Sequence, residues 1–109
     1  MSILTKAEDI INGDRAKAYG SPIKSFTKIA KGWSEIFDIE VTPEQVALAM
    51  TWLKICRELN KHQEDNLVDI AGYAGVLEKL IDEKDEESTQ IEILRRIQNS
   101  LSRIRMPIL

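Results

Sequence analysis

Apolar residues recur every three or four positions over most of this chain, and no segment sustains the alternation typical of a strand. Such spacing gathers apolar side chains on one stripe of a helix, so the pattern predicts an all-α protein. All three prolines lie at the borders of the periodic segments. The expected helices cover residues 3–11, about 22–37, about 43–60 and about 64–81.

Two of the expected helix starts carry local capping signals. Ser21 and Thr42 can each accept a hydrogen bond from a backbone amide of the following turn, and each precedes a proline that suits the first helical position. Gln45 follows Thr42 by three residues, a spacing that predicts a capping box. At the end of the first helix, we expect Gly13 to adopt the left-handed conformation that closes many helices.

A charged run at residues 82–87 is expected to interrupt the helical pattern. Ser88 then predicts the cap of a further helix, which would either dock on the other helices or pair with another chain. We expect residues 1–84 to form a four-helix-bundle-like core and residues 85–109 to form an additional C-terminal helix and tail. The heptad-like apolar positions of this helix are Ile91, Leu94, Ile97 or Gln98, Leu101 and Ile104.

Composition and charge narrow the class of protein. A chain of 109 residues suits a single domain, and its net charge of −3 argues against sequence-independent binding of nucleic acid. Cys56 is the only cysteine, so we expect no intramolecular disulfide and a reducing, cytoplasmic setting. No apolar run reaches the roughly 18 residues that span a membrane. Residues 1–6 contain no long apolar core, so no signal peptide is expected.

One carboxylate lies inside the apolar part of the helix expected at residues 64–81. Burying the charge of Asp69 is costly unless it is paired, hydrogen-bonded or metal-bound. Asp65 lies one turn earlier on the same face. Lys54, itself within an apolar run, is the nearest candidate cation, so we expect two facing helices to bring Lys54 and Asp69 together. Gly72 lies inside this helix, where glycine is less favourable than alanine by about 1 kcal/mol. A close helix crossing or a ligand that needs room would offset this cost.

Each of these charged residues admits two interpretations. Asp65 and Asp69 could hold Mg²⁺, since hard cations prefer carboxylate oxygens and bridge to phosphates. Alternatively, Asp65 is a solvated acid at a helix start and Asp69 is a paired acid of the core. Lys54 and Arg57 form a cationic face. That face either holds a phosphate, or Lys54 pairs with Asp69 while Arg57 stays in solvent.

The segment before the second helix offers two more candidates. Arg15 could bind a phosphate through two parallel hydrogen bonds, and Tyr19 could stack on a base beside a helix N-terminus that attracts anions. The alternative is an ordinary turn with Tyr19 packed on the helices. Because no nucleophile–base arrangement, glycine-rich phosphate loop or zinc spacing is present, acyl transfer and P-loop chemistry are not expected.

Several further side chains are expected to be structural. Trp33 and Trp52 lie at core-like helical spacing, and Leu59 falls on the apolar side of residues 43–60. Cys56 lies in the same apolar helix, where it would act as a small buried hydrophobe. His62, the only histidine, is expected on the surface of the turn that follows.

The motifs that follow one another along the chain are Asp14-Arg15, Tyr19-Gly20, Phe26 with Ile29-Ala30 and Trp33, Thr42-Pro43-Glu44 with Val46-Ala47-Leu48, Lys54, and residues 64–74. In this order they resemble a family of small phage and prophage proteins without an assigned function. The resemblance covers about residues 3–80. It implies a phage or prophage setting, inside the host cell, without implying an activity.

More distantly, the segment around Asp69 is similar to the last metal-binding motif of MazG-like all-α nucleoside triphosphate pyrophosphohydrolases. Those enzymes hold Mg²⁺ with a Glu-x-x-Glu pair on one helix and a Glu-x-x-Asp pair on the next, and water cleaves between the α and β phosphates. Asp69 matches the final Asp, whereas Asn66 replaces the preceding Glu and Asp65 lies beside it. The preceding helix carries Lys54, Arg57 and Glu58 but no Glu-x-x-Glu pair.

This resemblance implies a MazG-like helical bundle that binds a nucleotide or nucleoside triphosphate and forms a homo-oligomer. It leaves open whether Mg²⁺-dependent pyrophosphohydrolysis accompanies binding. The implied roles are Asp65 and Asp69 for Mg²⁺, Arg15 and Lys54 for phosphate, and Tyr19 or Trp33 for the base. The alternative hypothesis is a non-enzymatic interaction protein, whose C-terminal helix mediates dimerisation or binds a host factor while Lys54 and Asp69 form a structural pair.

Overall fold

The computed structural model describes residues 1–13 and 21–103, which form four helices and no strand. The predicted all-α class is therefore confirmed, and the three shorter helices begin and end within one residue of the predicted bounds. The helices are α1 (Ile3–Asn12), α3 (Pro22–Phe37), α4 (Pro43–Asn60) and α5 (Glu64–Arg103).

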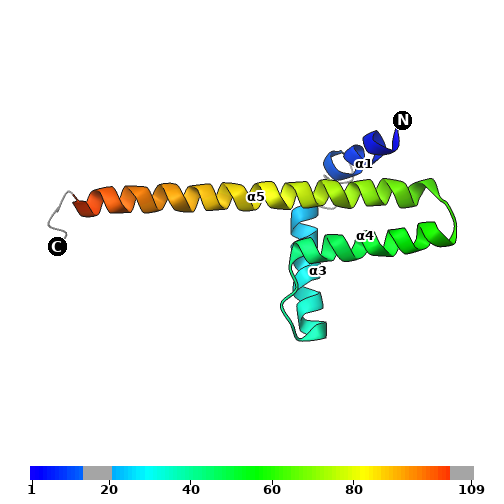
Figure 1. Cartoon of the computed structure of the whole chain (residues 1–109), viewed down its shortest axis with the longest axis horizontal. Helices are drawn as coiled ribbons and strands as arrows, with labels where there is room; N and C mark the ends of the chain where they lie inside the picture. The colour runs from blue at the N-terminus through cyan, green and yellow to red at the C-terminus, as the bar shows by residue number, and fades with distance from the viewer. Residues whose placement is uncertain (14–20, 104–109) are drawn as a thin grey trace.

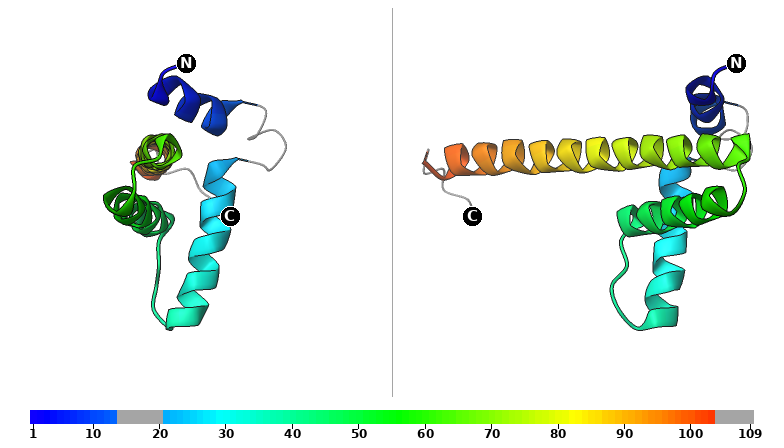
Figure 2. Two further views of the ribbon diagram at one scale, coloured as in Figure 1. Left: turned by 90° about the vertical axis from the view of Figure 1, so that its right-hand side faces the viewer. Right: turned by 45° about the vertical axis from the view of Figure 1, so that its right-hand side comes forward.

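The long helix α5 is the axis on which the other helices pack (Figure 1). α4 runs back along the first half of α5 in the opposite direction, and α1 lies against another side of the same half (Figure 2). α3 crosses these helices steeply and contacts α4 more extensively than α5. The described helices therefore do not confirm a closed, MazG-like four-helix bundle.

The buried core lies where α1, α3 and α5 meet. Ile11, Val76 and Leu80 form its centre, and the partly buried Ile23 and Phe26 of α3 pack against them. Apolar burial at this junction holds three helices together, because each contributes at least one of these side chains.

α4 buries a narrower face than its sequence predicted. Val46 and Ala47 are fully enclosed, whereas Trp52, Cys56 and Leu59 are exposed. The prediction that these last three lie in the core is wrong. α4 carries apolar residues on two faces, and α3 and α5 cover only one of them.

α5 continues as one helix of 40 residues through the charged run at 82–87, so the predicted break there is wrong. Ser88 lies inside this helix and caps no separate one. The run contains neither Gly nor Pro, and its Glu and Lys residues are good helix formers. Despite the length of α5, no helix in residues 1–13 and 21–103 is both long and apolar enough to cross a membrane.

The predicted N-caps are confirmed. The Ser21 side chain accepts a hydrogen bond from a backbone amide of the first turn of α3, and Thr42 and Gln45 form the predicted capping box at α4. Gly13 is extended, with φ −92° and ψ −152°, so its predicted left-handed conformation is wrong. The left-handed cap belongs to Asp38, which ends α3 at φ 53°.

Gly75, and not Gly72, marks the close approach of two helices. A Cβ atom built on Gly75 would lie 2.6 Å from Cδ1 of Ile11 in α1. A Cβ atom built on Gly72 meets no atom within 4 Å. The expected close helix crossing at Gly72 is therefore wrong, because α1 reaches α5 one turn later.

We expect Gly72→Ala to stabilise the protein by about 0.5–1 kcal/mol, since alanine favours the helix and the added methyl group has free space. Urea unfolding of both proteins measures the difference. Gly75→Ala is the comparison. Its gain in unfolding free energy should be smaller, because the added methyl group forces Ile11 to move. A loss of stability in Gly72→Ala would show that the space beside Gly72 is needed.

An ion pair ties the middle of α5 to the start of α4. Lys84 Nζ lies 2.8 Å from Oε1 of Glu44, whose side chain is mostly buried. The hydrogen bond from Lys84 lowers the pKa of Glu44 below its ordinary value, although burial opposes this shift. A lowered folded-state pKa adds stability above the unfolded-state pKa, and this stability is lost as the pH falls through the folded-state value.

We expect Lys84→Met to lower the free energy of unfolding at pH 7 by at most about 1 kcal/mol, because Lys84 itself is mostly exposed. The difference from the unmodified protein should shrink as the pH falls through the folded-state pKa of Glu44, because the protonated carboxyl no longer pairs with Lys84. Urea unfolding at a series of pH values measures it. A difference that stays constant with pH would contradict the role assigned to this pair.

Candidate functional site

The predicted pairing of Lys54 with Asp69 is confirmed. Lys54 Nζ, in the second half of α4, lies 2.8 Å from Oδ2 of Asp69, in the second turn of α5. The Lys54 side chain is 15% exposed and that of Asp69 is 34% exposed, so both charges are shielded from much of the solvent. Each charge offsets the desolvation of the other, which allows two apolar helices to carry them at their interface.

A groove of about 570 Å³ opens around this pair, between the end of α4 and the start of α5. Its volume falls within the range of small-ligand sites in proteins. The lining is unusually polar, because it also contains amide side chains. Its charged lining residues are Lys54, Arg57, Lys61, Asp65 and Asp69.

Glu58 holds the turn that forms one end of the groove. Its carboxylate accepts hydrogen bonds from the backbone amide of Gln63 at 2.8 Å and from the side chain of Asn66 at 3.3 Å. His62, exposed as predicted, also contacts this carboxylate. These contacts, first that with His62, lower the pKa of Glu58. Asn66 is buried and therefore supports the turn, where the MazG-like motif has a metal-binding Glu.

Two cations of the groove are not neutralised by ion pairs. In the described residues, neither Arg57 nor Lys61 forms a salt bridge, in contrast to Lys54. They are four residues apart at the end of α4. Arg57 lies in the last turn of α4, Lys61 is the extended residue that follows the helix, and both line the groove. The arrangement can therefore bind an anion, with a guanidinium that grips two oxygens and an ammonium beside it.

The same groove offers little to a bare metal ion. Within residues 1–13 and 21–103 there is no group of three His, Cys, Asp or Glu side chains that could hold one. Asp69 is occupied by Lys54, and Asp65 is exposed. Mg²⁺ is commonly held by one or two carboxylates together with phosphate oxygens. The residues therefore fit Mg²⁺ only as an ion that arrives with phosphate.

The structure brings together three of the predicted site residues, since Lys54, Asp65 and Asp69 line one groove. Trp33 is partly buried in α3 and is not among the residues that line it. Arg15 lies outside the described residues.

Tyr19 also lies outside the described residues, so its predicted stacking role stays a prediction. Sequence reasoning missed Lys61 as a groove cation. The available signal was its place in the polar turn between the helices that carry Arg57 and Asp65.

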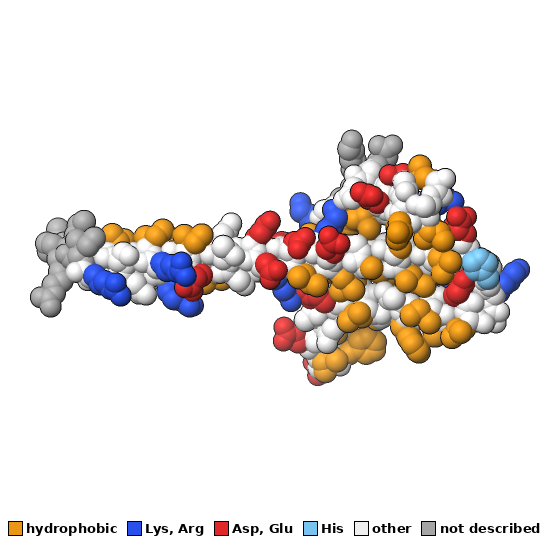
Figure 3. Space-filling model, turned by 45° about the horizontal axis from the view of Figure 1, so that its top comes forward, with side chains coloured by type: hydrophobic (Ala, Val, Ile, Leu, Met, Phe, Trp, Pro, Cys, Tyr) orange, Lys and Arg blue, Asp and Glu red, His pale blue; other side chains and the backbone are white. Residues whose placement is uncertain are grey.

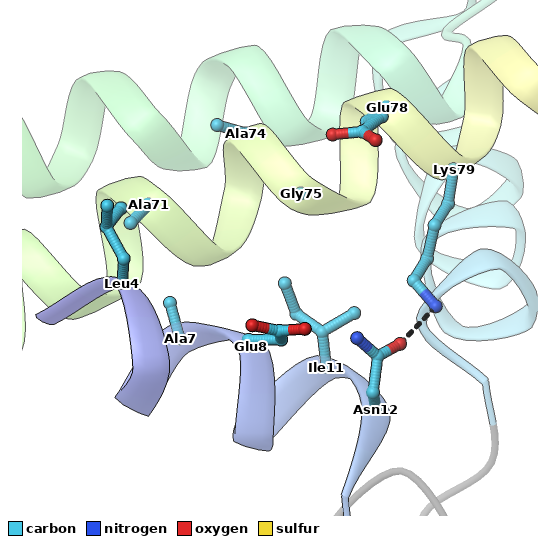
Figure 4. A pocket seen from close by; sticks show the side chains of 10 residues that line it. All are labelled: Leu4, Ala7, Glu8, Ile11, Asn12, Ala71, Ala74, Gly75, Glu78 and Lys79. Carbon is cyan, nitrogen blue, oxygen red and sulfur yellow. Dashed lines mark hydrogen bonds between the residues drawn. The ribbon is translucent and has the colours of Figure 1, made fainter. Parts of the chain in front are cut away.

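A second hollow, of about 370 Å³, lies between α1 and α5 (Figure 4). Its walls carry Ile11 and small residues of α5, with Glu8 and Glu78 at the rim. The Lys79 ammonium donates a hydrogen bond to the Asn12 side chain across one end. Because its lining is mostly small and apolar, we interpret this hollow as a gap in the packing of α1 against α5.

Comparison with known proteins places the chain among phage proteins. A sequence family described as a domain of unknown function (DUF6378) matches residues 2–81. The chain belongs to this family. Residues 88–103, in the projecting part of α5, lie beyond the matched region.

Two relatives are both called gene 55 protein. That of Mycobacterium phage L5 is 51% identical over 88 residues, which are 79% of this chain and 56% of the relative. That of Mycobacterium phage D29 is 34% identical over 106 residues, 95% of this chain and 70% of the relative. The chain thus spans little more than half of the L5 protein. No solved structure matches the chain significantly.

These matches confirm the resemblance to small phage proteins without an assigned function. They also support a phage accessory protein as the general class. The more distant similarity to MazG-like enzymes stays a prediction.

We expect Lys54→Met to lower the free energy of unfolding by about 1–3 kcal/mol, because it leaves the Asp69 carboxylate at a helix interface without its cation. The double variant Lys54→Met with Asp69→Leu should lose less unfolding free energy than the two single variants lose in sum. Urea unfolding of the four proteins in this cycle measures the coupling.

The control for this cycle is the exposed pair of Lys6 and Glu64, which are 2.7 Å apart between α1 and α5. Lys6→Met should lose less stability than Lys54→Met, because solvent screens an exposed pair. Equal losses of unfolding free energy in Lys6→Met and Lys54→Met would contradict a special structural role for Lys54 and Asp69.

Proposed function

We propose that this protein is a phage accessory protein that binds the phosphate groups of a nucleotide in the groove between α4 and α5. The observation that carries this proposal is the pair of unneutralised cations, Arg57 and Lys61, beside the Lys54–Asp69 ion pair. A small anion is bound by local charge, so the overall net charge of −3 does not oppose it.

Each groove residue has a distinct part in this proposal. Arg57 would grip two oxygens of one phosphate group, and Lys61 would act as a mobile point charge on the next. Lys54 would add a positive charge at the floor, with Asp69 holding its ammonium in place. Lys54 and Asp69 are half-buried and already positioned, so they would lose little entropy when the ligand binds.

Mg²⁺ belongs to the proposal as a companion of the phosphate groups. Asp65 is an exposed carboxylate on the groove and would contribute one oxygen ligand. The other groove carboxylate, Asp69, is paired with Lys54, and the oxygens of Glu58 already hold the turn. We therefore propose binding without efficient pyrophosphohydrolysis, since α4 carries no Glu-x-x-Glu pair to supply a second set of metal-binding carboxylates.

The remaining roles concern Trp33, which does not line the groove, and Arg15 and Tyr19, which lie outside the described residues. Arg15 would add a second guanidinium to the phosphates, and Tyr19 or Trp33 would stack on the base. We also propose the interior of the host cell as the place of action. This fits a chain with one cysteine, Cys56, which a reducing compartment would keep as a thiol.

We expect a nucleoside triphosphate with Mg²⁺ to raise the thermal unfolding midpoint by several degrees. Ligand at 100 times its dissociation constant adds about 2.7 kcal/mol of stability, and this amount shifts a domain of this size measurably. A thermal-shift panel of mono-, di- and triphosphates, with and without Mg²⁺, measures the effect. A flat panel would contradict the proposal.

Variants of the groove locate the effect. Arg57→Gln with Lys61→Gln should abolish the nucleotide-induced shift while the protein without ligand melts nearly as before. Asp65→Asn should keep the response to nucleotide and lose the increment due to Mg²⁺. The control, Lys28→Gln with Lys31→Gln, removes two exposed charges from α3 and should respond fully. A full response in the first variant would place the ligand elsewhere.

A further inference from the structure

The distal part of α5 carries an apolar stripe that no other described helix covers. It projects beyond α1, α3 and α4 (Figure 1), and every residue from 81 to 103 is exposed. An isolated helix of this length is marginally stable in water, because helices depend on packing of an apolar face. The stripe consists of Ile91, Ile93, Leu94, Ile97 and Leu101, each at least 50% exposed.

Apolar and charged side chains lie on opposite sides of this segment. In Figure 3 hydrophobic side chains gather mainly along one edge of the projecting rod, and the basic side chains lie along the other. Leu94, Ile97 and Leu101 have the alternating three- and four-residue spacing of a coiled-coil seam. Ile91 and Ile93 flank the seam and widen it.

The charged side of the segment needs no outside partner. Both carboxylate oxygens of Glu92 are engaged within the helix, at 3.3 Å from Arg95 and 3.3 Å from Arg96. The positions beside the seam are occupied by Ile91, Ile93 and uncharged polar residues. Charged residues at such flanking positions set partner choice in coiled coils. Their absence removes like-charge repulsion between two identical stripes.

We propose that residues 88–103 of α5 pair with the same segment of a second copy of this chain. Two copies would remove on the order of 1,000 Å² of surface from water, about the lower bound of a specific interface. Pairing of a stripe with itself gives a closed, two-fold dimer. The observations lie outside the groove, so the pairing does not depend on the nucleotide proposal.

Sedimentation of the full chain at about 1 to 200 µM, the range in which a micromolar dimer dissociates, tests the pairing. The mass is expected to rise from the 12.4 kDa of one chain toward that of two. Hydrogen exchange should show amides of residues 88–103 protected at high concentration and exposed at low concentration. A chain that stays monomeric at the highest concentration overturns the proposal.

Two matched double variants test the surface. Leu94→Glu with Ile97→Glu puts two charges into the stripe and should keep the chain monomeric. Asn99→Glu with Ser102→Glu adds the same charges at the same spacing outside the stripe and should dimerise normally. Circular dichroism verifies that both variants keep their helices.

A milder variant keeps the test decisive if the glutamates disturb the helix. Leu94→Ala with Ile97→Ala preserves helix propensity and should weaken dimerisation by at least tenfold. Dimerisation of unchanged strength in this variant, or in the stripe variant with glutamates, would assign self-association to another surface and overturn the proposal.

Discussion

The ion pair between Lys54 and Asp69 is the contact on which the proposed site depends. It joins α4 to α5 with both side chains partly shielded from solvent, so each charge makes the other tolerable. The pair bridges the two helices at the register in which they meet. With that register, Arg57 and Lys61 come to line the same groove as Asp65. The same ion pair therefore contributes to the packing of α4 on α5 and to the proposed ligand site.

The same pair explains why a metal cage of the MazG-like kind is not a good description of the groove. An ammonium group occupies the carboxylate that matches the motif, and Asn66 supports the turn where a ligand would be required. Positive charge delivered by a lysine is permanent and needs no cofactor. A groove built this way is suited to holding phosphate, whereas activation of water for hydrolysis calls for a positioned metal or base.

Much of this arrangement follows from local sequence rules. The caps at Ser21 and Thr42 and the Lys54–Asp69 pair were predictable, because capping and charge burial depend on short-range chemistry. The exposure of Trp52 was not, because it depends on which helix faces find partners. The continuity of α5 was predictable from the helix-forming residues of 82–87, and the break predicted there put too much weight on their charges. Periodicity shows that a stripe is apolar, but it does not show what covers it. For the uncovered stripe on distal α5, the proposed partner is a second copy of the chain.

The central claim is that phosphate binds at the junction of α4 and α5. Its most direct measurement is a series of amide NMR spectra of the ¹⁵N-labelled chain during titration with a nucleoside triphosphate and Mg²⁺. The account predicts saturable shifts that concentrate in residues 54–69, with smaller changes in distal α5. Shifts centred on the seam between α1 and α5, or no saturable shifts at any concentration, would contradict it.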